Sequence, residues 1–120
     1  MTDCIFCKLA SDANGAYIAE TKHLFAVYDK FPASPGHALI VPKRHIVTVF
    51  EMNKEESAEL SEILNAVKEH IESKHAPKAY NIGSNNGHEA GQVVMHLHIH
   101  VIPRYKGGHG MQLLGKGEKE

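Results

Sequence analysis

The chain has 120 residues, a length that suits one domain with a modest hydrophobic core. Hydrophobic residues make up 42% and charged residues 22%, as in an ordinary globular protein, and the formal net charge of -1 gives no electrostatic reason to expect nucleic acid or an anionic membrane as a partner. Ten histidines are the unusual feature, and they call for an explanation in metal, phosphate or proton chemistry.

The start of the chain, MTDCIFCKLA, has an early acidic residue and too short an apolar stretch for a signal peptide. No apolar run approaches the roughly 18 residues needed to cross a bilayer. We therefore expect a cytoplasmic protein, in which Cys4 and Cys7 are reduced thiols rather than a structural disulfide.

Three short strands are expected in the first part of the chain. Residues 16–20 and 24–28 are rich in β-forming residues, and residues 37–41 form a similar stretch that stops at Pro42. The segment PASPG, between the second and third strands, cannot continue a central strand, so we expect a loop there.

A long helix is expected in the middle of the chain. Asn53, followed three residues later by Glu56, is typical of a capping box, and the helix is expected to run to about His75 before Pro77 ends it. Its apolar positions recur at helical spacing and form one stripe, which consists of Leu60, Ile63, Leu64, Val67 and Ile71.

Two more strands are expected after the helix, separated by the polar loop NNGHEAG. The first covers residues 78–82, and the second runs from Gln92 to about Ile102, where Pro103 closes it. The expected fold is therefore α+β, an antiparallel sheet of about five strands with one long helix packed on it.

The composition indicates no second domain and no repeats. We expect a single domain over residues 1–110 and a flexible C-terminal tail over residues 111–120, which begins after several glycines and ends in charged residues.

The string HLHIHVIPR places three histidines on the expected final strand. Because side chains alternate between the faces of a strand, His96, His98 and His100 share one face. The apolar residues between them share the other face and should pack against the helix; these are Leu97, Ile99 and Val101. Same-face neighbours lie roughly 6.6 Å apart, so the row of rings is too spread to chelate one ion but well spaced to line a cleft.

The middle ring is the natural nucleophile of this row. A neutral imidazole attacks phosphorus when one ring nitrogen is free and the other is held by an acceptor, and His98 has a polar neighbour on each side. His100 could donate a proton to a phosphate oxygen, while Asn85 and the glycine-containing loop before the strand could hold the other oxygens. These residues favour phosphoryl or nucleotidyl transfer through a phosphohistidine. A metal-binding or purely structural row of histidines is the alternative.

The pair Cys4-x-x-Cys7 has three possible interpretations. It could be a redox pair, an incidental pair or half of a zinc site. A redox motif is expected at a helix start after a strand, within a βαβ pattern that is absent here. A zinc site would need two further ligands, often histidines.

The string NGHEAGQVVMHLHIHVIPR resembles the signature of the histidine triad (HIT) superfamily, with its His-x-His-x-His core. CIFC near the start, LFAVYDKFPASPGHALIVPKRHI in the middle and Asn85, thirteen residues before His98, extend the likeness over nearly the whole chain. The chain is most similar to the Hint-like bacterial branch, because the Fhit-like branch carries glutamine where Asn85 stands.

This resemblance implies a purine nucleotide site and hydrolysis of an AMP-linked bond, especially a phosphoramidate, through a nucleotidyl-histidine. His98 matches the nucleophile, and His100 and His37 match the histidines that support it. The substrate contacts that the resemblance implies are the phosphate loop with Asn85, Gly91 and Gln92, the ribose acid Asp29 beside Tyr28 and Lys30, and the base clamp Ile5, Phe6 and Leu9. Val93 departs from the eukaryotic Hint pattern, which has a serine near the leaving nitrogen.

The resemblance also implies a structural zinc ion held by Cys4, Cys7, His45 and His96, and a homodimer. Two reduced, buried thiols are the alternative to zinc. Two other functions remain open: a dinucleoside polyphosphate hydrolase, and a nucleotide-binding interaction module with little turnover.

Overall fold

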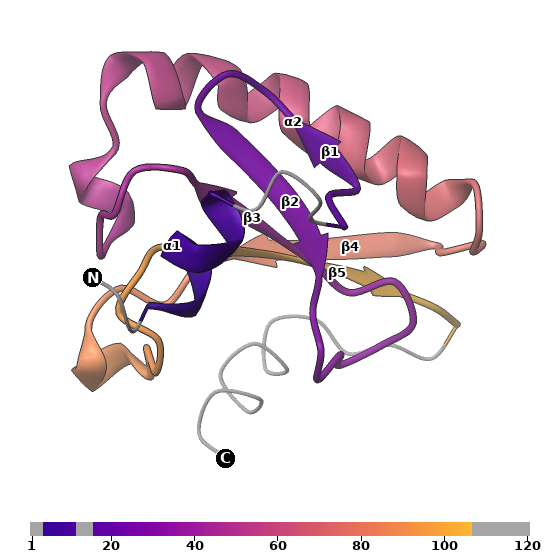
Figure 1. Ribbon diagram of the computed structural model, residues 1–120. Coiled ribbons are helices and arrows are strands. Elements are labelled where there is room, and N and C mark those ends of the chain that lie inside the picture. Colours follow the sequence, from indigo (N-terminus) through magenta and orange to yellow (C-terminus); the bar gives the residue numbers. More distant parts are fainter. Residues whose placement is uncertain (1–3, 12–15, 107–120) are drawn as a thin grey trace.

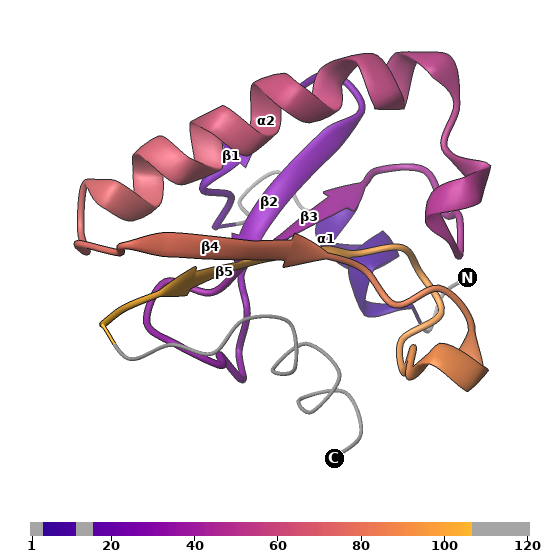
Figure 2. The ribbon, with the colours of Figure 1, turned by 180° about the vertical axis from the view of Figure 1, so that it is seen from behind.

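The computed structural model describes residues 4–11 and 16–106. They build a five-stranded sheet in the order β1-β2-β3-β5-β4, in which every neighbouring pair is antiparallel. The long helix α2 lies across one face of this sheet (Figures 1 and 2). The elements are α1 (Ile5–Ala10), β1 (Ala19–Glu20), β2 (Leu24–Tyr28), β3 (Ala38–Pro42), η1 (Val49–Glu51), α2 (Lys54–Glu72), β4 (Ala79–Gly83), η2 (His88–Ala90) and β5 (Ile99–Arg104). The expected α+β fold is confirmed.

The capping box that predicts α2 is present. The Asn53 side chain accepts a hydrogen bond from the backbone N–H of Glu56, and the Glu56 carboxylate accepts one from the backbone N–H of Asn53. The helix ends at Glu72, one turn before the expected end near His75. The expected first strand shortens to Ala19–Glu20, whereas the strand expected over 24–28 has the same bounds in the structure.

The final strand is shorter than expected, because it begins at Ile99 rather than at Gln92. Beyond the Ile40–Ile99 pair, β3 ends at Pro42, which has no N–H to donate and whose carbonyl oxygen is bound by the His96 ring. Residues 92–98 therefore form no ladder, and of the three histidines of the row only His100 lies in a strand.

Pro103 does not close β5 as expected but lies within it, paired with Tyr80 of β4. On the other side of β5 the ladder with β3 has already ended at the Ala38–Val101 pair. The missing N–H of Pro103 therefore costs no hydrogen bond on that side, and the carbonyl oxygen of Pro103 accepts one from the Ser34 hydroxyl at 2.6 Å.

The core has one apolar cluster on each face of the sheet. On the α2 face, Leu97, Ile99 and Val101 belong to the same buried cluster as the helix residues Ile63, Val67 and Ile71, which confirms that the apolar side of the histidine row faces the helix. On the opposite face, Phe6 of α1 packs with a second cluster made of Phe25, Val27, Leu39 and Val41.

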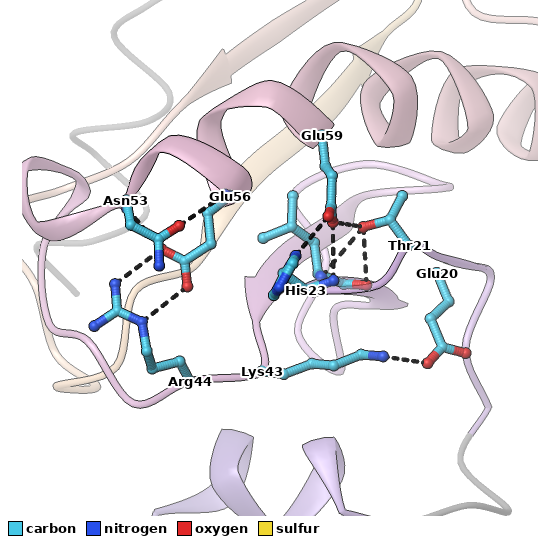
Figure 3. A network of polar contacts seen from close by, with 9 residues as sticks. Glu20, Thr21, His23, Lys43, Arg44, Asn53, Glu56 and Glu59 are labelled. Atoms are coloured by element: carbon cyan, nitrogen blue, oxygen red, sulfur yellow. Dashed lines mark hydrogen bonds and ion pairs between the residues drawn. The ribbon is translucent and has the colours of Figure 1, made fainter.

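A polar network ties α2 to the sheet (Figure 3). The carboxylate of Glu59 accepts hydrogen bonds from the Thr21 hydroxyl and from the His23 backbone N–H, at 2.5 and 2.8 Å. The buried carboxylate of Glu56 pairs with the Arg44 guanidinium at 3.0 and 3.1 Å. The pair between Glu56 and Arg44 fixes the chain immediately after β3.

The expected tail over 111–120, together with residues 107–110, lies outside the described residues. Among the residues that are described, no helix is both long and apolar enough to span a bilayer.

Candidate functional site

His98 is oriented by a backbone carbonyl. Its Nδ1 lies 2.9 Å from the carbonyl oxygen of His96, and because a carbonyl can only accept, Nδ1 carries the hydrogen. In the neutral ring, Nε2 then holds the lone pair. The ring of His98 is half-buried and stacks obliquely against Phe6, with centroids 5.2 Å apart, and edge-on against His100, also at 5.2 Å. The tautomer is the one that a nucleophilic imidazole requires.

His37 and His100 form a directed hydrogen-bond chain beside His98. The backbone N–H of Ala33 donates to Nδ1 of His37 at 2.9 Å, so the hydrogen of the neutral His37 ring is on Nε2. That Nε2 lies 2.9 Å from Nδ1 of His100 and 3.5 Å from a carboxylate oxygen of Asp29. Nδ1 of His100 therefore accepts, and the hydrogen of the neutral His100 ring is on Nε2.

Burial keeps His37 neutral. It lowers the pKa of His37 from 6.5 to about 4; the Asp29 carboxylate opposes this effect, whereas His100, Arg104 and His98 add to it. At neutral pH the His37 ring is uncharged, as its acceptance of the Ala33 N–H at Nδ1 requires.

Asp29 follows the end of β2 and faces this chain. One of its oxygens accepts the backbone N–H of Phe31 at 3.0 Å, and the other is the oxygen near His37. Lys30, next to it, is exposed. Tyr28 lies on the other face of the sheet, where its hydroxyl contacts Nδ1 of His70 in α2 at 3.0 Å. Tyr28 is therefore on the side away from the histidines.

The loop after β4 brings one unsatisfied donor to the site. Nδ2 of Asn85 is buried and has no hydrogen-bond partner among the described residues. The following Asn86 points elsewhere, because its side-chain oxygen accepts the backbone N–H of Val49 at 2.8 Å. A buried amide N–H without a hydrogen-bond partner destabilises the folded protein unless a ligand accepts its hydrogen bond. Asn85 is therefore suited to bind an anion.

Gln92 is buried and its polar atoms are engaged within the protein. Its carbonyl oxygen accepts the Gly87 N–H at 2.7 Å, and its NH2 group donates to the carbonyl oxygens of Val47 and Val94 at 2.8 and 3.1 Å. The side chain therefore shapes the loop rather than offering a donor. Gly91, in a left-handed conformation with φ of 97°, ends η2, and Val93 is 72% exposed.

The three apolar residues expected to clamp a base lie on α1. Phe6 is buried, Leu9 is half-buried against the same cluster, and Ile5 is exposed. No strong sequence signal predicts this six-residue helix, because its N-cap is Cys4, whose sulfur accepts the Cys7 N–H at 3.4 Å, rather than Ser, Thr, Asp or Asn.

A second cluster of donors lies next to α1. The sulfur of Cys4 is 3.2 Å from Nδ1 of His96, and the sulfur of Cys7 is 3.1 Å from Nδ1 of His45 and 3.6 Å from Nδ1 of His96. The two Nδ1 atoms are 3.2 Å apart. All four donor atoms lie within 4.8 Å of one another, so the structure brings together the four residues that the resemblance names.

This cluster fits a zinc ion. Nε2 of His96 lies 2.9 Å from the Pro42 carbonyl oxygen and must carry the hydrogen, which leaves the lone pair on Nδ1 facing the two sulfurs. Tetrahedral zinc with Zn–S bonds of about 2.3 Å and Zn–N bonds of about 2.0 Å separates its ligands by roughly 3.3–3.8 Å, close to the distances found here. Burial and the neighbouring Cys4 raise the pKa of Cys7, an effect that a bound cation would oppose.

Sequence reasoning missed Arg104. It is buried, with its Nε donating to the Asn81 side chain at 2.7 Å, while Nη2 has no hydrogen-bond partner among the described residues. Two residues beyond Ile102, it lies on the same face of β5 as His100. One further group of possible metal-ligand atoms lies within 4.8 Å of one another, and it comes from Asp29, His37 and His100. The hydrogen bonds among these residues already explain why they are close.

Comparison with known proteins identifies relatives over most of the chain. A family model described as HIT domain matches residues 11–107. The chain is 36% identical over 115 residues to Protein hit of Bacillus subtilis, covering 95% of this chain and 79% of that protein. It is 37% identical over 109 residues to adenosine 5'-monophosphoramidase hnt1 of Schizosaccharomyces pombe, covering 90% and 79%.

A third relative is longer. The AP-4-A phosphorylase of Mycobacterium tuberculosis is 36% identical over 98 residues, which cover 81% of this chain but 50% of that protein.

Solved structures agree with the sequence relatives. A member of the HIT family from Bacillus subtilis has a TM-score of 0.77 and 37% identity, covering 91% of this chain and 78% of that one. A Zn-bound histidine triad family protein from Mycobacterium smegmatis has a TM-score of 0.76 and 30% identity, covering 88% and 78%. From the matched family model and these relatives, the chain belongs to the HIT, or histidine triad, family.

Proposed function

We propose that this protein is a nucleotide hydrolase or transferase that acts on the α-phosphate of purine nucleoside phosphoramidates or related AMP-linked compounds. The observation that carries the proposal is the His98 ring, whose Nδ1–H is held by the His96 carbonyl oxygen so that Nε2 presents a lone pair. A histidine fixed in this tautomer can attack phosphorus and form a covalent nucleotidyl-histidine. The adenosine 5'-monophosphoramidase among the relatives supports the AMP-linked substrate class.

In the first step, Nε2 of His98 forms a bond to the α-phosphorus while the bond from phosphorus to the leaving group breaks, and the leaving group takes a proton from water. In the second step, the remaining hydroxide, or a water that releases a proton to solvent, attacks the same phosphorus, the P–Nε2 bond breaks, the nucleoside monophosphate leaves and the ring returns to its neutral form. His100 donates its Nε2–H to a phosphate oxygen in both steps. His37 positions His100, because its own Nε2–H points at Nδ1 of His100.

The remaining contacts follow from the residues around His98. We assign the phosphate to the unsatisfied Asn85 amide and the loop that Gly91 ends, with Gln92 as a positioning residue because its polar atoms are already bonded. Asp29, with Lys30 beside it, is assigned to the ribose hydroxyls. The base is assigned to α1, through Ile5, Phe6 and Leu9.

Val93 has no proton to give to a leaving nitrogen. Because the single N–H of the neutral His100 ring stays on the phosphate, a proton for that group must come from water, which reduces the expected preference for phosphoramidates over other AMP-linked substrates.

We also propose that Cys4, Cys7, His45 and His96 hold a structural zinc ion, which would supply charge compensation and cross-linking rather than take part in catalysis. The Zn-bound relative from Mycobacterium smegmatis supports this assignment. The test is metal analysis of protein purified without added ions. About one equivalent of zinc is expected, and a small fraction of an equivalent would count against the four ligands.

A second copy of the chain is the proposed partner. β4 is an edge strand of the sheet, and its Ile82 is 49% exposed, so this edge is available for pairing. A cytoplasmic location, in which both thiols would be reduced, stays a prediction from the sequence.

The catalytic proposal is tested with His98→Ala and AMP-linked phosphoramidates. The variant should bind AMP but lose turnover by about 1000-fold or more, because the covalent step is removed. The control is His70→Gln, which changes a histidine on the opposite face of the sheet and should turn over like the wild type. Unchanged turnover in His98→Ala would refute the assignment of the nucleophile.

Two alternatives are separated by the same assay. A faster rate on dinucleoside polyphosphates than on phosphoramidates would favour a polyphosphate hydrolase, an activity in keeping with the name of the AP-4-A phosphorylase relative. Wild-type AMP release no faster than the buffer background would favour a nucleotide-binding module.

A further inference from the structure

We propose that metal occupancy of the Cys4–Cys7–His45–His96 centre controls the affinity of the nucleotide site, because the centre and His98 share two direct connections. This inference rests on the proposed nucleotide-binding function and adds a regulatory link to it. The ion concerned is a soft divalent cation of the zinc type, as the two sulfurs and two imidazoles require.

The first connection is His96 itself. Its ring contributes Nδ1 to the metal centre, 3.2 Å from the Cys4 sulfur, while its backbone carbonyl oxygen accepts the Nδ1–H of His98 at 2.9 Å. The ring is also bound to the Pro42 carbonyl oxygen through Nε2. Residues 92–98 have no ladder partner, and two contacts place the carbonyl that orients His98: the anchored ring of His96, and the N–H of Leu97 in the same peptide group, which donates to the Ile46 carbonyl oxygen at 2.7 Å.

The second connection is Phe6. It stands in α1 between the two cysteines, is 7% exposed, and contacts both histidines, with ring centroids 5.7 Å from His96 and 5.2 Å from His98. A bound ion, held by Cys4 at the N-cap and by Cys7 one turn later, fixes the position of the helix that carries Phe6. The position of α1 thus determines both the packing of the His98 ring and one wall of the proposed base pocket.

Without the ion, the N-terminal end of α1 loses its strongest attachment. A six-residue helix is not stable by itself in water, and the contacts that remain are the packing of Phe6, Leu9 and Ala10 on the apolar cluster below and the hydrogen bond from the Tyr17 hydroxyl to the Leu9 carbonyl oxygen. The four donor groups would also lose the charge compensation that keeps them close together. Metal removal should therefore loosen α1 and residues 92–98 while α2 and the sheet keep their packing.

The experiment compares zinc-loaded wild-type protein with protein stripped by a chelator, each checked by metal analysis. AMP is the probe, because it is not turned over. Stripping should weaken AMP binding by about tenfold in calorimetry, a factor typical of coupled sites. Amide hydrogen exchange should become faster in α1 and stay unchanged in the middle of α2.

The reverse measurement uses the loaded, folded protein and covers the case in which stripping unfolds the chain. Because coupling between two sites is reciprocal, saturating AMP should raise the zinc affinity, measured by chelator competition, by the same factor of about ten. The proposal would be overturned if removing the metal changed the AMP affinity by no more than about twofold, or if saturating AMP left the zinc affinity unchanged. Failure of the loaded protein to bind AMP at all would instead contradict the proposed function.

Phe6→Leu is the matched variant. It keeps all four metal ligands and an apolar side chain, but it removes the ring that touches His98. It should still bind about one equivalent of zinc, while the dependence of AMP affinity on metal falls to about threefold or less. Full metal dependence in Phe6→Leu would overturn the role given to Phe6.

Discussion

At the scale of single residues, the site depends on which nitrogen of each histidine carries a hydrogen. Three backbone groups decide this: the His96 carbonyl for His98, the Ala33 N–H for His37 and the Pro42 carbonyl for His96. Backbone groups cannot change roles, so these tautomers are fixed by the fold rather than by pH. The sequence contains the histidines but gives no sign of these partners, because each depends on the path of the chain.

His37 should make the folded state sensitive to acid. Its pKa falls from 6.5 to about 4 on folding because of burial, so the unfolded chain binds the proton more readily. Above pH 6.5 the neutral His37 ring makes its full contribution to the stability of the folded state. This contribution is lost as the pH falls from 6.5 towards about 4, and the loss reaches about 3 kcal/mol.

The test is urea unfolding of the wild type and of His37→Gln at about pH 7 and about pH 5. Between about pH 7 and about pH 5, the free energy of unfolding of the variant should fall by about 1–2 kcal/mol less than that of the wild type. Equal pH dependence in both proteins would show that His37 titrates normally.

At the scale of elements, the sequence predicts those whose pattern is local. α2 carries its own capping box and apolar stripe, and β2 lies within its expected bounds. The start of β5 could not be predicted, because it depends on where the neighbouring strand β3 ends at Pro42. α1 was missed for the same kind of reason: its six residues are held by sulfur and apolar contacts to distant parts of the chain.

The loop between β2 and β3 depends on Gly36, which has a φ of 91°. A Cβ at this position would lie 3.1 Å from His75, 3.2 Å from Ile71 and 3.3 Å from Pro103, so the loop approaches the end of α2 closely. Gly36→Ala should destabilise the fold by about 2 kcal/mol, through backbone strain and through displacement of these neighbours.

Gly87→Ala separates the two causes. Gly87 has a φ of 105° and a ψ of 153°, a backbone conformation that is essentially restricted to glycine, and a Cβ there would meet nothing within 4 Å, so a loss of about 1–3 kcal/mol from backbone strain alone is expected. Urea unfolding of both variants measures the difference. A loss at Gly36 below about 1 kcal/mol would mean that neither the backbone strain nor the close packing there contributes as expected.

At the scale of the whole molecule, the sheet separates two tasks. The face under α2 holds the larger apolar cluster, and the opposite face carries His37, His98, His100 and the donor cluster. Strand alternation predicts this division from the sequence. It does not predict that residues 4, 7, 45 and 96 meet, since these lie in α1, in the segment after β3 and in the segment before β5; for these four, the resemblance to the HIT family supplied what spacing could not.

The sheet also has an open edge at β4, where we expect the second copy of the chain to pair. Ile82 is 49% exposed on this strand, so a charge there should disfavour burial in an interface without disturbing the core. Ile82→Glu should convert a dimer to a monomer, as measured by light scattering during gel filtration. The control is Phe50→Glu, which places the same charge at an 86% exposed aromatic in η1 and should leave the mass unchanged. A dimeric Ile82→Glu protein would place the interface elsewhere, and a monomeric wild type would remove the dimer from the proposal.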